Sequence, residues 1–109
     1  MRRGDVHWVQ DQVGVSGSEI KKKRPWIIVG NNALNRARKT VIAVPLSTSA
    51  PESPPISFKV SVRGSLVVAI CDQIRAIDKN KFEKTPFDAL SVQDMALIDD
   101  GLKQVLALQ

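Results

Sequence analysis

The sequence predicts a mainly β protein with a C-terminal α-helix, folded as a small curled barrel. Five or six short segments are rich in β-branched residues, and one segment near the end has helical periodicity. The 109 residues are too few for two packed sheets, so a single domain spanning 1–109 is expected. With 43% apolar and 25% charged residues, the composition is that of a soluble globular domain.

The first part of the chain predicts two strands separated by a long loop. Asp5–Val9 alternates between apolar and polar residues, and Trp26–Val29 is a short apolar run that follows Pro25. Residues 10–24 are polar and contain two glycines, which predicts a loop. A loop of this length in so small a domain is usually functional.

The middle of the chain predicts a turn, a strand and a second loop. Asn31 to Arg36 indicates a turn, with a short helical turn as the alternative, and Thr40–Val44 follows as a strand. Ser47–Pro55 contains three prolines and three serines, so it cannot pair in the middle of a sheet.

Further strands are predicted for Ile56–Val60 and Leu66–Ile70, on either side of a turn at Arg63-Gly64. After a bend at Cys71-Asp72, the sheet is expected to continue through Gln73–Ile77.

The last segment predicts an amphipathic helix. Ser91 followed three residues later by Asp94 resembles a capping box. Apolar residues then recur at helical spacing: Met95, Ile98, Leu102, Val105 and Leu106. Gly101 is expected to weaken this helix by about 1 kcal/mol relative to alanine.

Charge is distributed unevenly along the chain. Residues 1–40 carry nine Lys or Arg and three acidic residues, whereas the remainder carries seven and eight. Four cations, from Lys21 to Arg24, precede the predicted buried strand. A cationic loop held by a rigid strand can present charge to a phosphate backbone, although a solvated basic face is an equally good interpretation of the charge alone.

Other classes of protein are disfavoured. Cys71 is the only cysteine, which excludes an internal disulfide and favours a reducing, cytoplasmic location. No apolar run is long enough to span a membrane, and no signal peptide is recognisable. His7 is the only histidine, and we expect it at a strand surface and expect no metal site.

Several motifs, in order along the chain, resemble those of the MazF/PemK toxins of bacterial toxin–antitoxin pairs. They are Arg3-Gly4-Asp5-Val6, Gly17-Ser18-Glu19, Arg24-Pro25 before an apolar strand, Pro45-Leu46-Ser47-Thr48-Ser49, and Asp72-Gln73-Ile74-Arg75 with Ile77-Asp78-Lys79. The resemblance implies an SH3-like barrel of the CcdB/PemK type and a homodimer. It also implies a cofactor-free, metal-independent endoribonuclease that cuts single-stranded mRNA at short sequences and is covered by an acidic antitoxin.

Arg24 is the first candidate catalytic residue. Its planar guanidinium can bind two phosphoryl oxygens and stays charged at any relevant pH. The resemblance places the family's central arginine at this position. Because its pKa exceeds about 12, we assign it electrostatic stabilisation of the pentavalent phosphorane rather than proton donation.

Ser47 and Thr48 are candidates for hydroxyls that donate to the phosphate. The resemblance aligns Ser47 with the family's catalytic or phosphate-binding threonine, but the usual order of threonine then serine is inverted here. The residues alone are also compatible with a turn that caps a strand end.

Glu19 and Asp72 are the candidate bases for the 2′-hydroxyl. Family members that use the matching aspartate carry an arginine where this chain has Ile70, and a histidine where it has Ser18. An unperturbed carboxylate with a pKa of about 4 is a poor base at neutral pH. Asp72 is equally interpretable as a structural anchor of the sheet.

Further residues are expected to contact RNA. Asn31 and Gln73 offer paired donors and acceptors to base edges. The lysines can grip phosphates, so the expected RNA-binding set is Ser18, Lys21, Lys22, Lys23, Asn31 and Gln73. Trp8 and Trp26 have faces on which bases could stack, but Trp8 is interpreted as a core residue and Trp26 as a residue of the core or of a dimer interface.

Two other classes remain as alternatives. One is a gyrase-poisoning toxin of the CcdB kind, which is disfavoured because the chain ends Leu106-Ala107-Leu108-Gln109 without a tryptophan. The other is an RNA- or peptide-binding barrel without catalysis, opposed only by Arg24 and the Ser47-Thr48 pair.

Overall fold

The computed structural model describes residues 1–11 and 22–109, and for Asp11 and Lys22 it describes the backbone alone. Seven strands form one antiparallel sheet in the order β4-β5-β3-β2-β1-β7, and β6 pairs with β3. The elements are β1 (Asp5–Asp11), β2 (Lys22–Ile28), α1 (Asn32–Ala37), β3 (Thr40–Ser47), β4 (Ser57–Val62), β5 (Ser65–Ile70), the 3₁₀ turn η1 (Cys71–Gln73), β6 (Arg75–Asp78), the 3₁₀ turn η2 (Lys79–Lys81), β7 (Asp88–Ala89) and α2 (Val92–Leu106).

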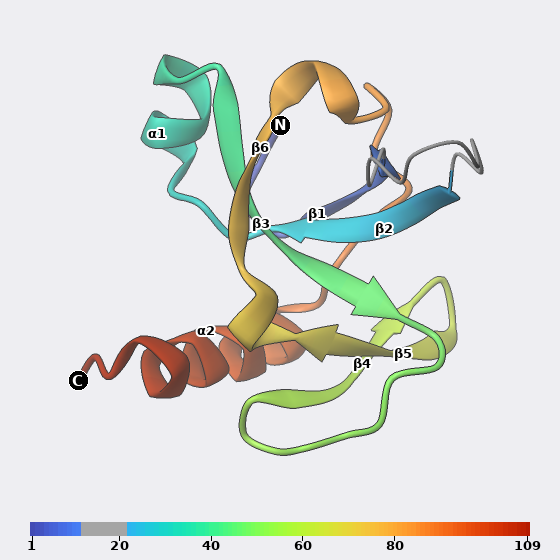
Figure 1. Ribbon diagram of the computed structural model, residues 1–109, viewed down its shortest axis with the longest axis vertical. Coiled ribbons are helices and arrows are strands. Elements are labelled where there is room, and N and C mark those ends of the chain that lie inside the picture. Colours follow the sequence, from blue (N-terminus) through green and yellow to red (C-terminus); the bar gives the residue numbers. More distant parts are fainter. Residues whose placement is uncertain (12–21) are drawn as a thin grey trace, which may run out of the picture.

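The strand β3 is the central element of the curled sheet (Figure 1). Its first half pairs with β6, its middle with β2, and its last residues, Leu46 and Ser47, with β5. A strand that changes partners along its length turns the sheet into a half-barrel, and α2 closes its lower end in Figure 1. The predicted class, mainly β with a C-terminal helix, is confirmed.

The two faces of the central strands pack into different clusters, because side chains alternate along a strand. One cluster lies between the sheet and α2 and includes Ile27, Val44 and Ile98. The other includes Trp26, Ile28 and Phe82. β2 and β3 are therefore apolar on both faces where they cross the middle of the molecule.

The predicted loop over residues 10–24 is wrong at both ends. β1 extends to Asp11, and β2 begins at Lys22, with Val9 opposite Arg24 and Gln10 opposite Lys23. Lys22, Lys23 and Arg24 thus belong to a strand rather than a loop. Polar side chains are tolerated there because this end of the hairpin extends beyond the apolar core.

Pro25 lies inside β2 instead of marking its start. At this position β2 pairs with β1 only, since its pairing with β3 begins at Trp26. A strand with one neighbour tolerates a residue that lacks an N–H donor.

Other boundaries shift for similar reasons. β3 continues past Val44 to Ser47, because Leu46 and Ser47 pair with β5. The turn η1 replaces the start of the strand predicted at Gln73. The two-residue strand β7 was not predicted, since so short a segment has no periodicity to detect.

The terminal helix begins as predicted at Ser91, whose hydroxyl oxygen accepts a hydrogen bond from the Asp94 amide at 3.1 Å. The Asp94 carboxylate does not complete a capping box, because it accepts from the Ser61 amide at 2.9 Å. Gly101 does not interrupt the helix. A Cβ at this position would lie 2.9 Å from the Pro55 carbonyl oxygen and 3.0 Å from the Cys71 sulfur, so glycine permits close packing on the sheet.

Candidate active site

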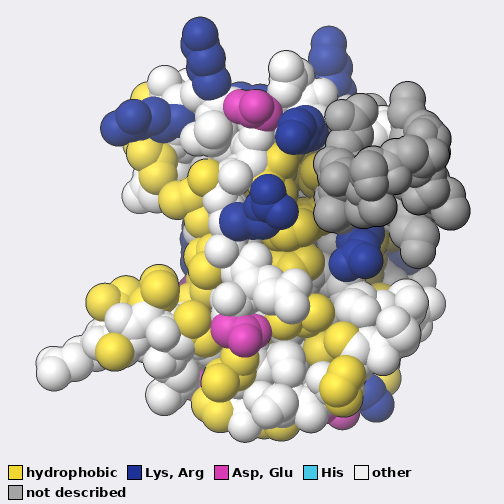
Figure 2. Space-filling view, viewed as in Figure 1, with side chains coloured by type: hydrophobic (Ala, Val, Ile, Leu, Met, Phe, Trp, Pro, Cys, Tyr) yellow, Lys and Arg dark blue, Asp and Glu magenta, His cyan; other side chains and the backbone are white. Residues whose placement is uncertain are grey.

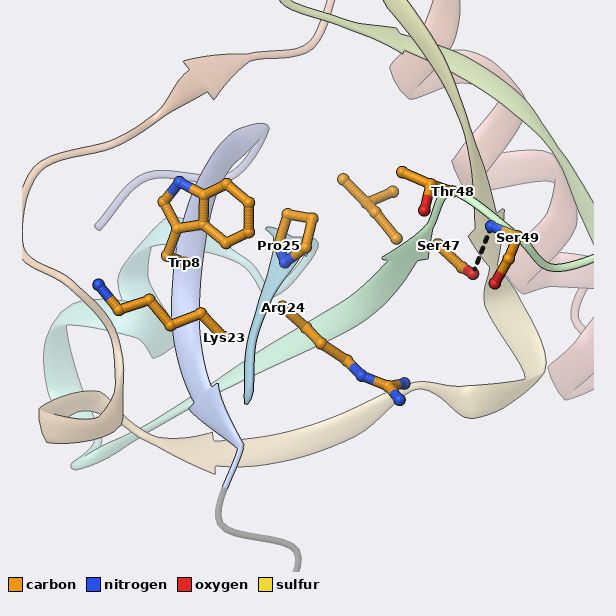
Figure 3. A pocket seen from close by; sticks show the side chains of 8 residues that line it. Trp8, Lys23, Arg24, Pro25, Ser47, Thr48 and Ser49 are labelled. Carbon is orange, nitrogen blue, oxygen red and sulfur yellow. Dashed lines mark hydrogen bonds between the residues drawn. The ribbon is translucent and has the colours of Figure 1, made fainter. Parts of the chain in front are cut away.

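A pocket of about 300 Å³ is lined by residues of β1, β2 and the end of β3 (Figure 3). Its residues come from separate parts of the chain: Trp8, Lys23, Arg24, Pro25, Leu46, Ser47, Thr48 and Ser49. The pocket therefore brings together the predicted catalytic residues Arg24, Ser47 and Thr48, and the predicted RNA-binding residue Lys23.

Arg24 reaches the pocket from the exposed end of β2. The strand pairing places it opposite Val9, which is buried, and two residues before the buried Trp26. Its side chain extends from β2 in a different direction from that of Lys23 (Figure 3). The backbone of Arg24 is thus held by the core while its guanidinium stays exposed to a ligand.

Ser47 is fixed by the backbone that follows it. Its hydroxyl oxygen accepts hydrogen bonds from the amides of Ser49 at 3.2 Å and Ala50 at 3.0 Å, and the first of these is drawn in Figure 3. This is the strand-end turn that the residues alone allowed. Because the oxygen accepts both bonds, the hydroxyl proton remains available to donate to an anion.

Thr48 has the more exposed side chain of the two. Ser47 is half-buried and held in one orientation, whereas Thr48 makes no side-chain hydrogen bond to the other residues that the structure describes. The two hydroxyls are therefore distinguishable by how firmly each is positioned.

Lys23 forms an ion pair with Glu83, from the segment after η2. The two side chains are 53% and 43% exposed, so the pair is a surface contact. Ser18, Glu19 and Lys21, together with the side chain of Lys22, lie outside the described residues.

The remaining predicted residues do not line this pocket. Asp72 and Gln73 are exposed on η1 at the end of β5. Asn31 precedes α1, where its side-chain oxygen accepts a hydrogen bond from the Ala33 amide at 2.8 Å and caps the helix.

Trp8 is the pocket residue that the sequence interpretation placed elsewhere. It was expected in the core, but it is half-buried and its indole forms one wall of the pocket (Figure 3). Trp26 is buried as expected, at 6% exposure. Alternation along β1 places Trp8 on the same face as the buried Val6, so the sequence carried no signal that its ring would be partly open.

His7 is buried at 1% exposure, so the expectation of a strand-surface histidine is wrong. Its Nδ1 lies 2.6 Å from the Glu83 carbonyl oxygen, which can only accept, so Nδ1 carries the proton and donates it. The ring also packs edge-on against Phe82.

Cys71 is buried and unpaired, as predicted. Burial, reinforced by the neighbouring Asp72 charge, raises the pKa of its thiol to about 11. The thiol therefore stays protonated at neutral pH and is a poor nucleophile.

Two further features concern the described residues alone. Residues 1–11 and 22–109 contain no group of three or more His, Cys, Asp or Glu side chains placed to hold a metal ion. Within the same residues, no helix is long and apolar enough to cross a membrane.

Basic side chains gather on the upper half of the face in Figure 2, where Figure 1 places α1, β2 and β6. The whole chain carries a net charge of +5. A pocket that combines a cationic side chain, two hydroxyls of which one is held by backbone amides, and basic residues on the surrounding surface has the chemistry of a phosphodiester-binding site.

This fold and pocket agree with a match to a family model. Residues 2–106 match the PemK-like, MazF-like toxins of type II toxin–antitoxin systems. The chain belongs to this family.

Curated relatives align over almost the whole chain. An endoribonuclease MazF9 of Mycobacterium tuberculosis is 27% identical, and the alignment covers 99% of this chain and 98% of the relative. An endoribonuclease MazF of Staphylococcus saprophyticus is 32% identical and covers 99% and 92%.

Solved structures share the fold. A mycobacterial endoribonuclease in complex with its cognate antitoxin has a TM-score of 0.83 at 24% identity, covering 100% of this chain and 97% of that one. A mycobacterial endoribonuclease alone has a TM-score of 0.79 at 25% identity, covering 99% and 92%. MazF from Deinococcus radiodurans has a TM-score of 0.79 at 18% identity, covering 99% and 97%.

Proposed function

We propose how this chain, an endoribonuclease toxin by its family and its curated relatives, cleaves RNA. The substrate's own 2′-hydroxyl attacks the adjacent phosphorus of a single-stranded mRNA, and neither a metal ion nor a cofactor takes part. The observation that carries this proposal is that Arg24 and the hydroxyls of Ser47 and Thr48 line one pocket. The 2′-oxygen is the nearest nucleophile to the phosphorus, so attack from within the substrate needs only orientation.

In this reaction the 2′-oxygen forms a bond to phosphorus and the bond to the departing 5′-oxygen breaks. The 2′-hydroxyl loses its proton to a base, and the leaving oxygen gains a proton. The products are a 2′,3′-cyclic phosphate and a 5′-hydroxyl. Charge accumulates on the non-bridging oxygens of the phosphorane, where the guanidinium of Arg24 stabilises it.

Ser47 is the better placed of the two hydroxyls to donate to a non-bridging oxygen. The amides of Ser49 and Ala50 hold its oxygen, so little ordering is required when the phosphate binds. Thr48 is the alternative donor. For the base, both Glu19 and Asp72 stay open, since Glu19 lies outside the described residues and Asp72 does not line the pocket.

The proposed partners are single-stranded mRNA, an acidic antitoxin and a second copy of the chain. The net positive charge favours the two anionic partners. Among the solved structures of the same fold, one is a complex with a cognate antitoxin and others are MazE–MazF complexes. Light scattering on the purified chain, alone and with an acidic antitoxin peptide, tests both assemblies.

The mechanism is tested with an RNA oligonucleotide that contains one mapped cut site. A 2′-deoxy nucleotide on the 5′ side of the cut should stop cleavage in EDTA and leave binding nearly unchanged. The matched control is a 2′-deoxy nucleotide one position further on, which should be cleaved normally. Cleavage of the first oligonucleotide, or a 5′-phosphate on the product, would overturn the mechanism.

A further inference from the structure

The indole of Trp8, which forms one wall of the pocket, is packed against a neighbouring ring. It packs against the Phe87 ring with centroids 5.0 Å apart and planes inclined by 56°. The Arg63 guanidinium lies 4.5 Å from the centroid of the same Phe87 ring, and the Arg63 Nε donates to the Phe87 carbonyl oxygen at 2.9 Å. Arg63 therefore packs on Phe87, and Phe87 supports the indole of Trp8.

The rest of the pocket has two chemically different parts. Pro25 and Leu46 continue the apolar wall that Trp8 begins, whereas Arg24 and the hydroxyls of Ser47 and Thr48 supply hydrogen-bond donors. Trp8 and Pro25 are cross-strand partners, so the two rings lie side by side at one end of the pocket (Figure 3). A nucleotide has the same division, a flat base beside an anionic phosphate.

The size of the pocket limits what it can hold. Small-molecule sites are about 300–1,000 Å³, and this one lies at the lower end. The hollow itself therefore has room for about one base with its phosphate.

We propose that Trp8 is the stacking platform for one base that flanks the scissile phosphate. Stacking on Trp8 positions the RNA so that Arg24 can bind the non-bridging oxygens of that phosphate. This inference rests on the proposed function. Aromatic side chains bind unpaired bases through their faces, and every base has such a face. Trp8 accordingly fixes the position of the substrate more than the identity of the base.

Trp26 provides a matched control on the neighbouring strand. It lies one residue after Pro25, but it is buried in the second cluster and does not line the pocket. Arg75 lies over its ring at 6.0 Å. A general loss of aromatic packing would be shared by both tryptophans, whereas loss of stacking on RNA belongs to Trp8 alone.

The test is an abasic scan of the mapped oligonucleotide with wild type, Trp8→Leu, Trp8→Phe and Trp26→Phe. In the wild type, an abasic site at one of the two flanking positions should slow cleavage by about 5- to 150-fold. Trp8→Leu should slow cleavage of the intact RNA by a similar factor and lose its sensitivity to that abasic site. Trp8→Phe should retain part of the sensitivity to the abasic site, and Trp26→Phe should retain all of it.

Independent, multiplying effects of Trp8→Leu and the abasic site would overturn the proposal, as would a wild type that is insensitive at both flanking positions. A wild type that does not cut the intact RNA would instead refute the proposed function.

If Trp8→Leu does not fold, the fluorescence of Trp8 itself can test whether a base stacks on it. Trp26→Phe leaves Trp8 as the single tryptophan. Its emission should be quenched by the uncleavable 2′-deoxy oligonucleotide but not by the same oligonucleotide with the abasic site. Equal quenching by the two, or none by either, would contradict stacking on Trp8.

Discussion

The two halves of β2 differ in almost every physical respect although they are continuous in sequence. Trp26–Ile28 lies between β1 and β3, and its three side chains are at most 6% exposed. Lys22–Pro25 pairs with β1 alone, and the side chains of Lys23 and Arg24 are exposed. The pocket opens beside Lys22–Pro25, where β2 has no pairing with β3.

This difference shows how a small domain holds a charged group ready for chemistry. Arg24 is separated from the buried Trp26 by one residue, so the core restrains its backbone although the residue is exposed. Substitutions in the two halves should therefore damage different properties.

The largest effect is expected from Arg24→Ala in the exposed half. Removing a charge-stabilising donor from a reaction that develops negative charge typically costs about 10²- to 10³-fold in rate. Arg24→Lys should recover little, because a point charge cannot bind two oxygens at once. The measurement is the single-turnover rate of RNA cleavage, with thermal unfolding recorded on the same sample.

Arg24→Ala should unfold within a few degrees of the wild type, since an exposed cation adds little to stability. Cleavage within about tenfold of the wild-type rate, which is about 1.4 kcal/mol of barrier, would show that the assignment is wrong.

In the buried half, a substitution is expected to lower the free energy of unfolding and to leave the cleavage rate unchanged. Ile27 has 0% exposure, and Ile27→Val removes one methylene group from the cluster beneath α2. The free energy of unfolding should fall by about 0.5–1.5 kcal/mol, while the cleavage rate measured well below the melting temperature stays unchanged. Denaturant unfolding and the same cleavage assay check both. If Ile27→Val slowed cleavage and left the free energy of unfolding unchanged, the two halves of β2 would not have the different roles assigned to them.

The smallest effect is expected for Lys23→Ala. Its ion pair with Glu83 is about half exposed, so breaking it should change the free energy of unfolding by less than about 1 kcal/mol. Cleavage should weaken slightly and depend a little less on salt, because one phosphate contact at most is lost. Glu83→Gln is the matched control for the ion pair, and it should leave the salt dependence of cleavage unchanged. If Lys23→Ala lost as much activity as Arg24→Ala at low salt, the minor role assigned to Lys23 would be wrong.

The sequence was sufficient for those features that depend on local patterns. The apolar runs around Ile27 and Val67 predicted strands, and Ser91 predicted the start of α2. The resemblance predicted that Arg24 and Ser47 work together, and the pocket is consistent with it.

Features that depend on distant partners could not be predicted in this way. Lys23 and Arg24 resemble loop residues until β1 is seen to pair with them. A tryptophan within a strand is typically a core residue. Only the position of Phe87 shows which part of the Trp8 ring is left uncovered. His7 is buried, and the hydrogen bond of its Nδ1 goes to the Glu83 carbonyl oxygen, a partner far along the chain that local sequence cannot reveal.

The central claim is that Arg24 acts on the transition state and not mainly on binding of the RNA. The most direct test compares wild type and Arg24→Ala in two measurements: Kd for the uncleavable 2′-deoxy oligonucleotide and the single-turnover rate for its cleavable counterpart. We predict a rate that falls by about 10²-fold or more while Kd changes by only a few-fold. A Kd that weakens by the same factor as the lost kcat/KM, with the rate at saturating protein unchanged, would contradict it.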